Sequence, residues 1–286
     1  MNLRRFIEAA LDEDVGAGDL TTSSCVPADR RGLGTIYSKE PTLVVSGQEP
    51  AAEVFRQVAE RRGVTATYRA IAADGQRVLK GGLVAEVEAP LAVLLEGERL
   101  ALNLMMKLSG IATRVKDYTD AAQGKLRVVD TRKTTPLLRE LEKKAVRHGG
   151  AHNHRFALYD GVMIKDNHIS AVGGITQAVS KVRANVHHLV RIEVEVTTLD
   201  ELHEALEAGA DVLLLDNMND ELLQRAVNEA RAKRPAVVLE ASGNITPERI
   251  ARIRDFGLDV VSSGGLIHQA VWVDLSMDLR ALPDVS

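Results

Sequence analysis

The sequence predicts an α/β fold with two regions, and three observations support this prediction. From about residue 125, short β-branched runs alternate with helical segments, which is typical of repeated βα units and a parallel sheet. Residues 1–110 mix helical and strand-like runs without that regular alternation. Polar residues gather where the strands of the second region end. This last pattern favours a barrel over an open doubly wound sheet, because α/β barrels build their active sites at that face.

The first region opens with an amphipathic helix and closes with a long one, whose apolar residues recur at spacings of three and four. Its predicted elements follow in chain order: a helix at 2–13, a Gly-rich turn at 16–19, strands at 34–39 and 42–47, a helix at 50–62, strands at 65–71 and 82–89, and a helix at 91–122.

The second region contains six predicted strands, each followed by a helical segment or a Gly-rich turn. They cover 126–130, 161–166, 190–196, 211–216, 236–243 and 259–265. The polar or charged residues at their ends are Asp130, Arg132, Lys133, Lys165, Asp166, Glu195, Asp216, Glu240, Ser242, Ser262 and Gly264.

Composition excludes several classes of protein. At 286 residues the chain is long enough for two domains. A net charge of -4 argues against a nucleic-acid surface, which needs a basic domain. Cys25 is the single cysteine, so an intrachain disulfide is impossible and a reducing compartment is expected. No run approaches the 18 or so apolar residues of a membrane span, and the N-terminal helix is too acidic for a signal peptide. We therefore expect a cytoplasmic protein with no membrane partner.

One segment is basic although the chain is acidic. Residues 130–169 hold eight Lys or Arg against five Asp or Glu, and four of the eight histidines. The helical part of this segment is expected to present a solvated face with modest ion pairs. That face comprises Arg139, Lys143, Lys144 and Arg147 with Glu140 and Glu142.

The cations outside that helix follow strands or lie in a Gly-rich loop. They are Arg132, Lys133, His154, Arg155 and Lys165. Arg binds carboxylate or phosphate bidentately, and Lys is a compact charge suited to phosphate oxygens. Cations that converge on a barrel mouth predict a ligand with several negative charges. The His152-Asn153-His154 run is a weak zinc pattern, so no zinc is expected there.

The acidic residues and the Gly-Ser turns predict the rest of the site. Glu195 alternates with valines inside a strand, on the same side as Glu193, and an inward carboxylate is costly unless it has a partner. Glu195 and Asp216 suit Mg²⁺, which prefers carboxylates, water and substrate phosphates. The turns around Ser242–Gly243 and Gly264–Gly265 each precede a helical segment, and barrels often bind phosphate in their last loops.

At this point the motifs resemble a known family. The runs DTRKTTP, NHR, LYDGVMIKDNHI, EVEV, LLLDNM and LEASGNI occur in the order typical of the quinolinate phosphoribosyltransferases, and the segments ALDEDVGAGDLTT and GERLALNLMMKLSGIAT resemble their N-terminal domain. The resemblance implies an N-terminal α/β sandwich domain at 1–112, joined by the C-terminal segment 270–286, and an incomplete parallel α/β barrel at 113–269. It also implies a homodimer with shared active sites, which in some members assembles into hexamers.

The resemblance implies transfer of the phosphoribosyl group from phosphoribosyl pyrophosphate to quinolinate, with decarboxylation to nicotinate mononucleotide. It places Arg132, His154, Arg155 and Lys165 around the two carboxylates, with Arg99 donated by the neighbouring subunit. Lys133 and Lys165 then lie near the pyrophosphate and ribose, and Glu195 and Asp216 near the ribose and Mg²⁺. By the same resemblance, the 5-phosphate binds in the loops that contain Ser242, Gly243, Gly264 and Gly265. Such anionic substrates account for the basic segment.

Three alternatives remain open. The first is a phosphosugar aldolase or isomerase with Lys165 as a Schiff base, and the second is a paralogous branch associated with molybdenum transport. The third is a nucleic-acid-binding protein, against which the acidic total and the 3% aromatic content count. The sequence departs from the family pattern at Leu137, where Gly is frequent, and at Ile267-His268-Gln269, where Thr-His-Ser is common.

Overall fold

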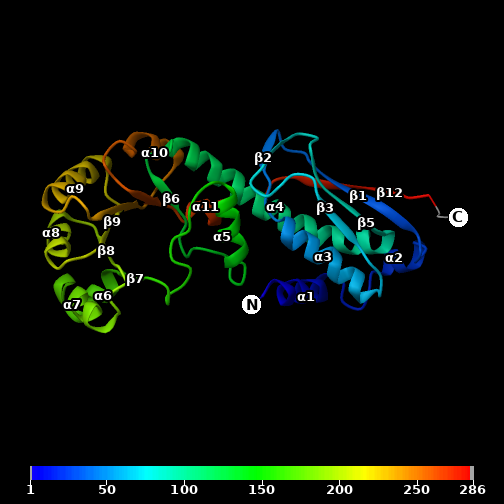
Figure 1. Cartoon of the computed structure of the whole chain (residues 1–286), viewed down its shortest axis with the longest axis horizontal. Helices are drawn as coiled ribbons and strands as arrows, with labels where there is room; N and C mark the ends of the chain where they lie inside the picture. Colours follow the sequence, from blue (N-terminus) through cyan, green and yellow to red (C-terminus); the bar gives the residue numbers. More distant parts are fainter. Residues whose placement is uncertain (1, 284–286) are drawn as a thin grey trace. The chain divides into compact units, whose positions relative to one another are not determined.

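The fold is that of a computed structural model, which describes residues 2–283 (Figure 1). These residues form two compact units. The first contains 2–116, 135–150 and 269–283, and the second contains 117–134 and 151–268. Residues 135–150 therefore group with the first unit although they lie between segments of the second. The domain boundaries expected at 112 and 269 stay predictions, and 284–286 lie outside the described residues.

The first unit contains a four-stranded antiparallel sheet in the order β12-β1-β5-β3. Its strands are β1 (Arg31–Ser38), β3 (Thr67–Ala70), β5 (Leu83–Pro90) and β12 (Leu275–Ala281), and a small second sheet pairs β2 (Thr42–Val44) with β4 (Arg77–Leu79). Every second residue of β1 is buried, which is the alternation of a strand with one face on a core. The C-terminal strand β12 completes the sheet by pairing along β1 from Gly32 to Ser38.

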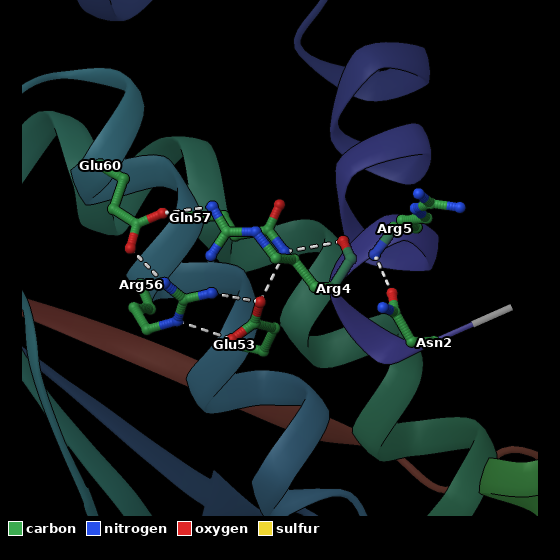
Figure 2. A network of polar contacts seen from close by, with 7 residues as sticks. All are labelled: Asn2, Arg4, Arg5, Glu53, Arg56, Gln57 and Glu60. Atoms are coloured by element: carbon green, nitrogen blue, oxygen red, sulfur yellow. Dashed lines mark hydrogen bonds and ion pairs between the residues drawn. The ribbon is translucent and has the colours of Figure 1, made fainter.

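Helices supply the other side of this core. They are α1 (Leu3–Asp14), α2 (Leu20–Cys25), α3 (Gln48–Arg61) and the first part of α4 (Leu91–Ala122). Ile7 and Leu11 of α1 are fully buried, as are Val54 and Phe55 of α3. Polar contacts also join α1 to α3, since the Gln57 side chain donates to the Arg4 carbonyl and Arg4 pairs with Glu60 (Figure 2). The predicted helices at 2–13, 50–62 and 91–122 are confirmed within one or two residues.

Helix α5 (Arg139–His148) corrects one expectation. A solvated face was predicted for its charged residues, but Glu142 and Lys143 are buried, at 0% and 3% exposure. Glu142 lies 3.1 Å from the Lys107 ammonium and accepts the Thr135 N–H. Lys144 does form the expected surface pair, since it lies 3.4 Å from Glu140. Helical spacing alone cannot show that a neighbouring element covers a charged face.

The second unit is built on a parallel six-stranded sheet in the order β6-β11-β10-β9-β8-β7. Its strands are β6 (Arg127–Val129), β7 (Val162–Ile164), β8 (Ile192–Val196), β9 (Val212–Asp216), β10 (Val238–Ser242) and β11 (Val260–Ser262). All six lie inside the predicted runs. Strands β7 to β11 follow one another in chain order, and β6 lies beside β11 at the far edge, as in a barrel that does not close between β6 and β7. The predicted fold class is confirmed.

Short helices connect these strands. They are α6 (Asp166–Val172), α7 (Ile175–Asn185), α8 (Leu199–Glu207), α9 (Asp220–Lys233), α10 (Pro247–Ile253) and α11 (Gly265–His268). Figure 1 shows α8, α9 and α10 along the outer side of the strands. Side chains of Thr198, Asn219 and Thr246 cap α8, α9 and α10, so each helix begins directly after a polar residue that follows its strand. Among residues 2–283, no helix has both the length and the apolar character needed to cross a membrane.

Candidate active site

The carboxyl ends of the parallel strands place several polar side chains on one face of the second unit. Glu195 of β8 and Glu240 of β10 both pair in register with Leu214 of β9, and Asp216 pairs with Ser242. Side chains in register on parallel strands point to the same side of the sheet. The strands therefore bring three carboxylates and one hydroxyl to the same face, at the edge where an α/β barrel places its chemistry.

Lys165 and Glu195 form an ion pair on this face. The Lys165 ammonium contacts Glu195 Oε2, and the Glu195 side chain is 14% exposed. Lys165 caps α6, and its backbone N–H donates to the ring of His168 at 3.0 Å. Both Lys165 and Glu195 are predicted site residues, and the structure brings them together. A partly exposed ammonium held by a carboxylate at a strand end is placed to meet an anionic ligand.

Arg132 and Arg155 place two guanidinium charges near each other. Arg155 is half-buried and donates to the Gly161 carbonyl at 2.8 Å, while Arg132 is exposed. Burial lowers the pKa of Arg155, and the charge of Arg132 lowers it further. Two cations that repel each other without an anion between them favour binding of a negatively charged group. This pair fits the predicted carboxylate subsite.

His154 lies in a buried acidic cluster. Its Nε2 is 3.3 Å from Glu193 Oε2 and 3.8 Å from Glu240 Oε1, and its Nδ1 accepts the backbone N–H of Arg155 at 2.7 Å. Burial lowers the pKa of His154, but the hydrogen bond and charge of Glu193, with the charge of Glu240, raise it overall. The Nδ1 contact limits this rise, because a second proton on Nδ1 would face the N–H of Arg155.

Glu240 is a carboxyl with an unusual environment. Burial raises its pKa to about 7, and the charge of Glu193 raises it further while His154 lowers it. Glu193 Oε1 and Glu240 Oε1 are buried without a hydrogen-bond partner. Neither residue was assigned a role in the site from the sequence, although Glu240 was among the polar residues at the strand ends. The signal was present, since each is a carboxylate inside an otherwise apolar strand, but nothing in the sequence showed which cation faces them.

The predicted phosphate turns are tightly built. Gly243 has a φ of +85°, and a Cβ there would lie 2.1 Å from Asn217 Oδ1, so only glycine fits between the loops after β9 and β10. A Cβ on Gly264 would lie 2.6 Å from the Lys133 side chain. The structure thus brings predicted residues Lys133 and Gly264 together, with Gly265 beginning α11 next to them. In the unusual segment after the last strand, Ile267 is buried and His268 is exposed.

Arg99 belongs to the first unit, where it lies on α4 and is exposed. The other predicted site residues lie in the second unit. Among residues 2–283, one group of three or more potential metal ligands occurs, and it is His154 with Glu193 and Glu240. Glu195 and Asp216 do not belong to such a group. Two carboxylates without a third protein ligand fit Mg²⁺, which usually completes its shell with water and substrate phosphates.

Comparison with known proteins then shows the family. The model of the quinolinate phosphoribosyl transferase C-terminal domain matches residues 111–278, and that of the N-terminal domain matches 19–109. The chain belongs to the quinolinate phosphoribosyltransferase family. The two matches meet near residue 110, inside the continuous helix α4.

Individual relatives cover nearly the whole length of this family member. The chain is 42% identical to a probable nicotinate-nucleotide pyrophosphorylase [carboxylating] of Synechocystis, over 96% of this chain and 91% of the relative. It is 34% identical to a tobacco quinolinate phosphoribosyltransferase [decarboxylating], over 97% and 82%. The crystal structure of NadC from Streptococcus pyogenes superposes with a TM-score of 0.91 at 38% identity, covering 98% and 97%. The resemblance inferred from the motifs is confirmed.

Proposed function

We infer that this protein transfers the phosphoribosyl group of phosphoribosyl pyrophosphate to the ring nitrogen of quinolinate, with loss of CO₂. The observation that carries this conclusion is the set of cations in the second unit, where Arg132 lies near Arg155 and Lys165 pairs with Glu195. A relative that is named for this activity matches 97% of this chain, and both domain models of the family match the chain. A dicarboxylate and a pyrophosphorylated sugar phosphate both carry the negative charges that would pair with these cations.

The cations divide between the two substrates in our proposal. Arg132, His154, Arg155 and Lys165 form the subsite for the two carboxylates of quinolinate, and Arg99 of a second copy completes it. Lys133 and Lys165 bind the pyrophosphate side of the sugar, and the turns at Ser242–Gly243 and Gly264–Gly265 bind the 5-phosphate. The contact of Lys133 with Gly264 supports this division, since it puts a cation beside a glycine turn.

Glu195 and Asp216 have two roles in the proposal. Their carboxylates face the ribose, where they favour the positive charge that develops on the anomeric carbon as pyrophosphate departs. They would also hold Mg²⁺, partly through water and substrate, and the ion would supply positive charge to offset that of the departing pyrophosphate. The partner of Glu195 is Lys165, so the same carboxylate also orients a cation toward the substrates.

The bond changes follow from the chemistry of the substrates. The pyridine nitrogen attacks the anomeric carbon, the bond from that carbon to pyrophosphate oxygen breaks, and nitrogen becomes cationic. The bond between the ring and its 2-carboxylate then breaks, CO₂ leaves, and the electron pair stays on the carbon beside the cationic nitrogen until a solvent proton neutralises it. The chain supplies positioning and charge, and no side chain forms a covalent intermediate.

Assembly and location are also proposals. A homodimer with shared sites follows from the role given to Arg99, whose exposed side chain on α4 is available to another copy. A cytoplasmic location is consistent with the single, exposed Cys25. Neither nucleic acid nor membrane is part of the proposed function.

The decisive experiment is a turnover assay with quinolinate, phosphoribosyl pyrophosphate and Mg²⁺ that follows nicotinate mononucleotide and CO₂ together. Nicotinate serves as the matched substrate that lacks the 2-carboxylate. We expect product from quinolinate alone. Equal turnover of nicotinate would contradict the two-carboxylate subsite. No product from folded protein, together with borohydride trapping of a phosphosugar on Lys165, would replace the proposal with an aldolase.

A further inference from the structure

Three buried carboxylates surround the segment Asn153–Arg155, and the proposed reaction gives none of them a role. Asp130 is fully buried, and Glu193 and Glu240 are 7% and 4% exposed. They come from the end of β6, from β8 and from β10. Burying a carboxylate is costly unless it is paired or hydrogen-bonded. Carboxylates gathered from three strands around one short loop therefore require an explanation.

Asp130 holds the backbone of this segment. Its Oδ1 accepts the His154 N–H at 2.8 Å, and its Oδ2 accepts the Asn153 amide at 2.7 Å. A parallel bridge between Val129 and His152 fixes the chain just before it. These contacts set the position of the His154 backbone but do not fix the rotation of its ring. The orientation of the ring depends on other groups.

Glu193 and Glu240 set that orientation. The N–H of Arg155 donates to Nδ1 of His154, so Nδ1 must offer a lone pair and the ring hydrogen must lie on Nε2. That Nε2 faces both carboxylates, at 3.3 Å and 3.8 Å. The chain of contacts thus runs from two buried carboxylates, through the imidazole, to the backbone of Arg155. Both ring nitrogens are engaged inside the protein.

A metal site is the competing explanation for this cluster. One ligand atom each from His154, Glu193 and Glu240 lies within 4.8 Å of the others, and two of the carboxylate oxygens have no hydrogen-bond partner. A metal ion would take the lone pair of Nε2, and the ring hydrogen would then lie on Nδ1 and require an acceptor. Nδ1 instead faces the Arg155 N–H, which is a donor. The hydrogen-bond directions therefore argue against a metal.

We propose that Glu193 and Glu240 are positioning residues that lock the His154 ring, so that Nδ1 fixes the Arg155 backbone and aims its guanidinium at a carboxylate of quinolinate. This inference rests on the proposed function, since quinolinate is the ligand that Arg155 meets. His154 stays part of the carboxylate subsite, but it acts there through Arg155 and not as a direct donor to the substrate. Arg132 and Arg155 supply the positive charge that binds the substrate. His154 links the strands that hold its ring to the backbone of the loop at Arg155.

The first test determines which nitrogen of the His154 ring carries the hydrogen, and it needs no substrate. Nitrogen NMR of protein with isotope-labelled histidine, assigned with a His154→Gln variant, reports which ring nitrogen carries hydrogen. We expect Nδ1 as the bare nitrogen and Nε2 as the protonated one in the wild-type protein. Hydrogen on both nitrogens, or on Nδ1 alone, overturns the proposal. So does a zinc-induced shift of the Nε2 resonance at one equivalent of zinc, which would identify a metal site.

The second test separates the two substrates. Glu193→Ala removes the acceptor, and we expect it to raise the KM for quinolinate about tenfold or more, as loss of an outer partner does elsewhere. The KM for phosphoribosyl pyrophosphate should stay within about twofold, because its binding groups are untouched. Glu193→Gln should restore most of the quinolinate affinity, since its amide oxygen still accepts the Nε2–H. An equal rise of both KM values overturns the proposal.

A matched control separates positioning from a loss of folding. Asp211 is also a strand-end carboxylate of the second unit that accepts a backbone N–H, yet it does not face the Asn153–Arg155 segment. Asp211→Asn should lower the free energy of unfolding while leaving both KM values unchanged. If the wild-type protein does not convert quinolinate at all, the proposed function fails. The NMR measurement on the same protein still decides whether Glu193 and Glu240 lock the ring.

Discussion

The two ends of the parallel strands in the second unit use carboxylates in opposite ways. At the amino ends, Asp211 accepts the Ile192 N–H and an Arg183 N–H, both at 2.8 Å. Asp259 repeats the arrangement further along the sheet, with the Leu239 N–H at 2.8 Å and an arginine of α9 at 2.7 Å. In each case one carboxylate oxygen joins a strand to the helix that precedes it. These carboxylates have their partners within the fold.

At the carboxyl ends the carboxylates are less completely satisfied. Glu195 holds a lysine that is itself 43% exposed. Glu193 and Glu240 lie further back along β8 and β10, and their Oε1 atoms are buried without a hydrogen bond. Backbone strain gathers in the same loops, because Asn217 and Asn244 have φ values of +54° and +51°. We infer that the carboxylates at the amino ends stabilise the fold, whereas the charged groups and strained loops at the carboxyl ends bind ligands.

The largest expected effect is a loss of turnover when a charged residue at the carboxyl ends is removed. Lys165→Ala should reduce turnover of quinolinate by about 10²–10³, the usual cost of removing one group that stabilises charge in the transition state. Its free energy of unfolding should change little, because the ammonium is partly exposed. Turnover and urea unfolding are measured on the same preparation. Lys181→Ala, an exposed lysine on α7, is the control and should retain full turnover.

The next effect is a pH dependence that Glu240 introduces. Its pKa of about 7 in the folded protein exceeds the ordinary value of 4.5, mainly because of burial. The unfolded chain therefore loses this proton first, and stability falls as pH rises from about 4.5 to about 7. The loss of stability is on the order of 3 kcal/mol, because each pKa unit corresponds to ~1.4 kcal/mol.

Glu240→Gln removes this titration while His154 and Glu193 remain. We expect the stability difference between wild type and variant to change in favour of the variant between pH 5 and pH 7. Urea unfolding at both pH values measures it. A difference that does not change with pH would show that Glu240 is ionised in both states and would weaken the contrast between the two ends.

A smaller effect is expected at the amino ends. Burial raises the pKa of Asp211, but the Ile192 N–H and Arg183 outweigh burial and hold the pKa below its ordinary value. Asp211→Asn should lower the free energy of unfolding by about 1.5–3 kcal/mol, as for hydrogen bonds to charged groups. Activity per folded molecule should persist, and Asp200→Asn on the exposed face of α8 is the control. Lost activity in fully folded Asp211→Asn would contradict the assignment of this end to stability.

The smallest effect concerns Leu137, in the loop that follows β6. It has a φ of +67° and is 73% exposed, so it bears backbone strain without burying its side chain. Leu137→Gly should relieve that strain and raise stability by about 1 kcal/mol or less, because glycine's greater unfolded-state freedom offsets part of the gain. Thermal unfolding measures the shift. A destabilised variant would show that Leu137 makes a contact that outweighs its strain.

Most of the fold followed from periodicity. The β-branched runs at 126–130, 161–166 and 211–216 contain the strands β6, β7 and β9, and the long helix at 91–122 followed from its apolar spacing. Burial of Glu142 and Lys143 did not follow, since it depends on which element packs against α5.

The same limit applies to the site. The pairs Lys165–Glu195 and Lys133–Gly264 join residues that the sequence had already singled out. The sequence could not show that Glu193 and Glu240 face His154, because the residues lie on separate elements and register alone brings them together. Glu193 and Glu195 of β8 look alike in the sequence, yet Glu193 faces His154 and Glu195 pairs with Lys165.

The pairing of β12 with β1 has a consequence for synthesis of the protein. Ser38 pairs with Leu275 and Gly32 with Ala281, so β1 of the first unit pairs with a strand that follows the whole second unit in the chain. Until the ribosome releases them, β1 keeps one edge open, while all strands of the second unit have already been made. A chain that stops before Leu275 would leave that edge exposed. Pairing of β12 with β1 is therefore the last step that closes this edge of the sheet.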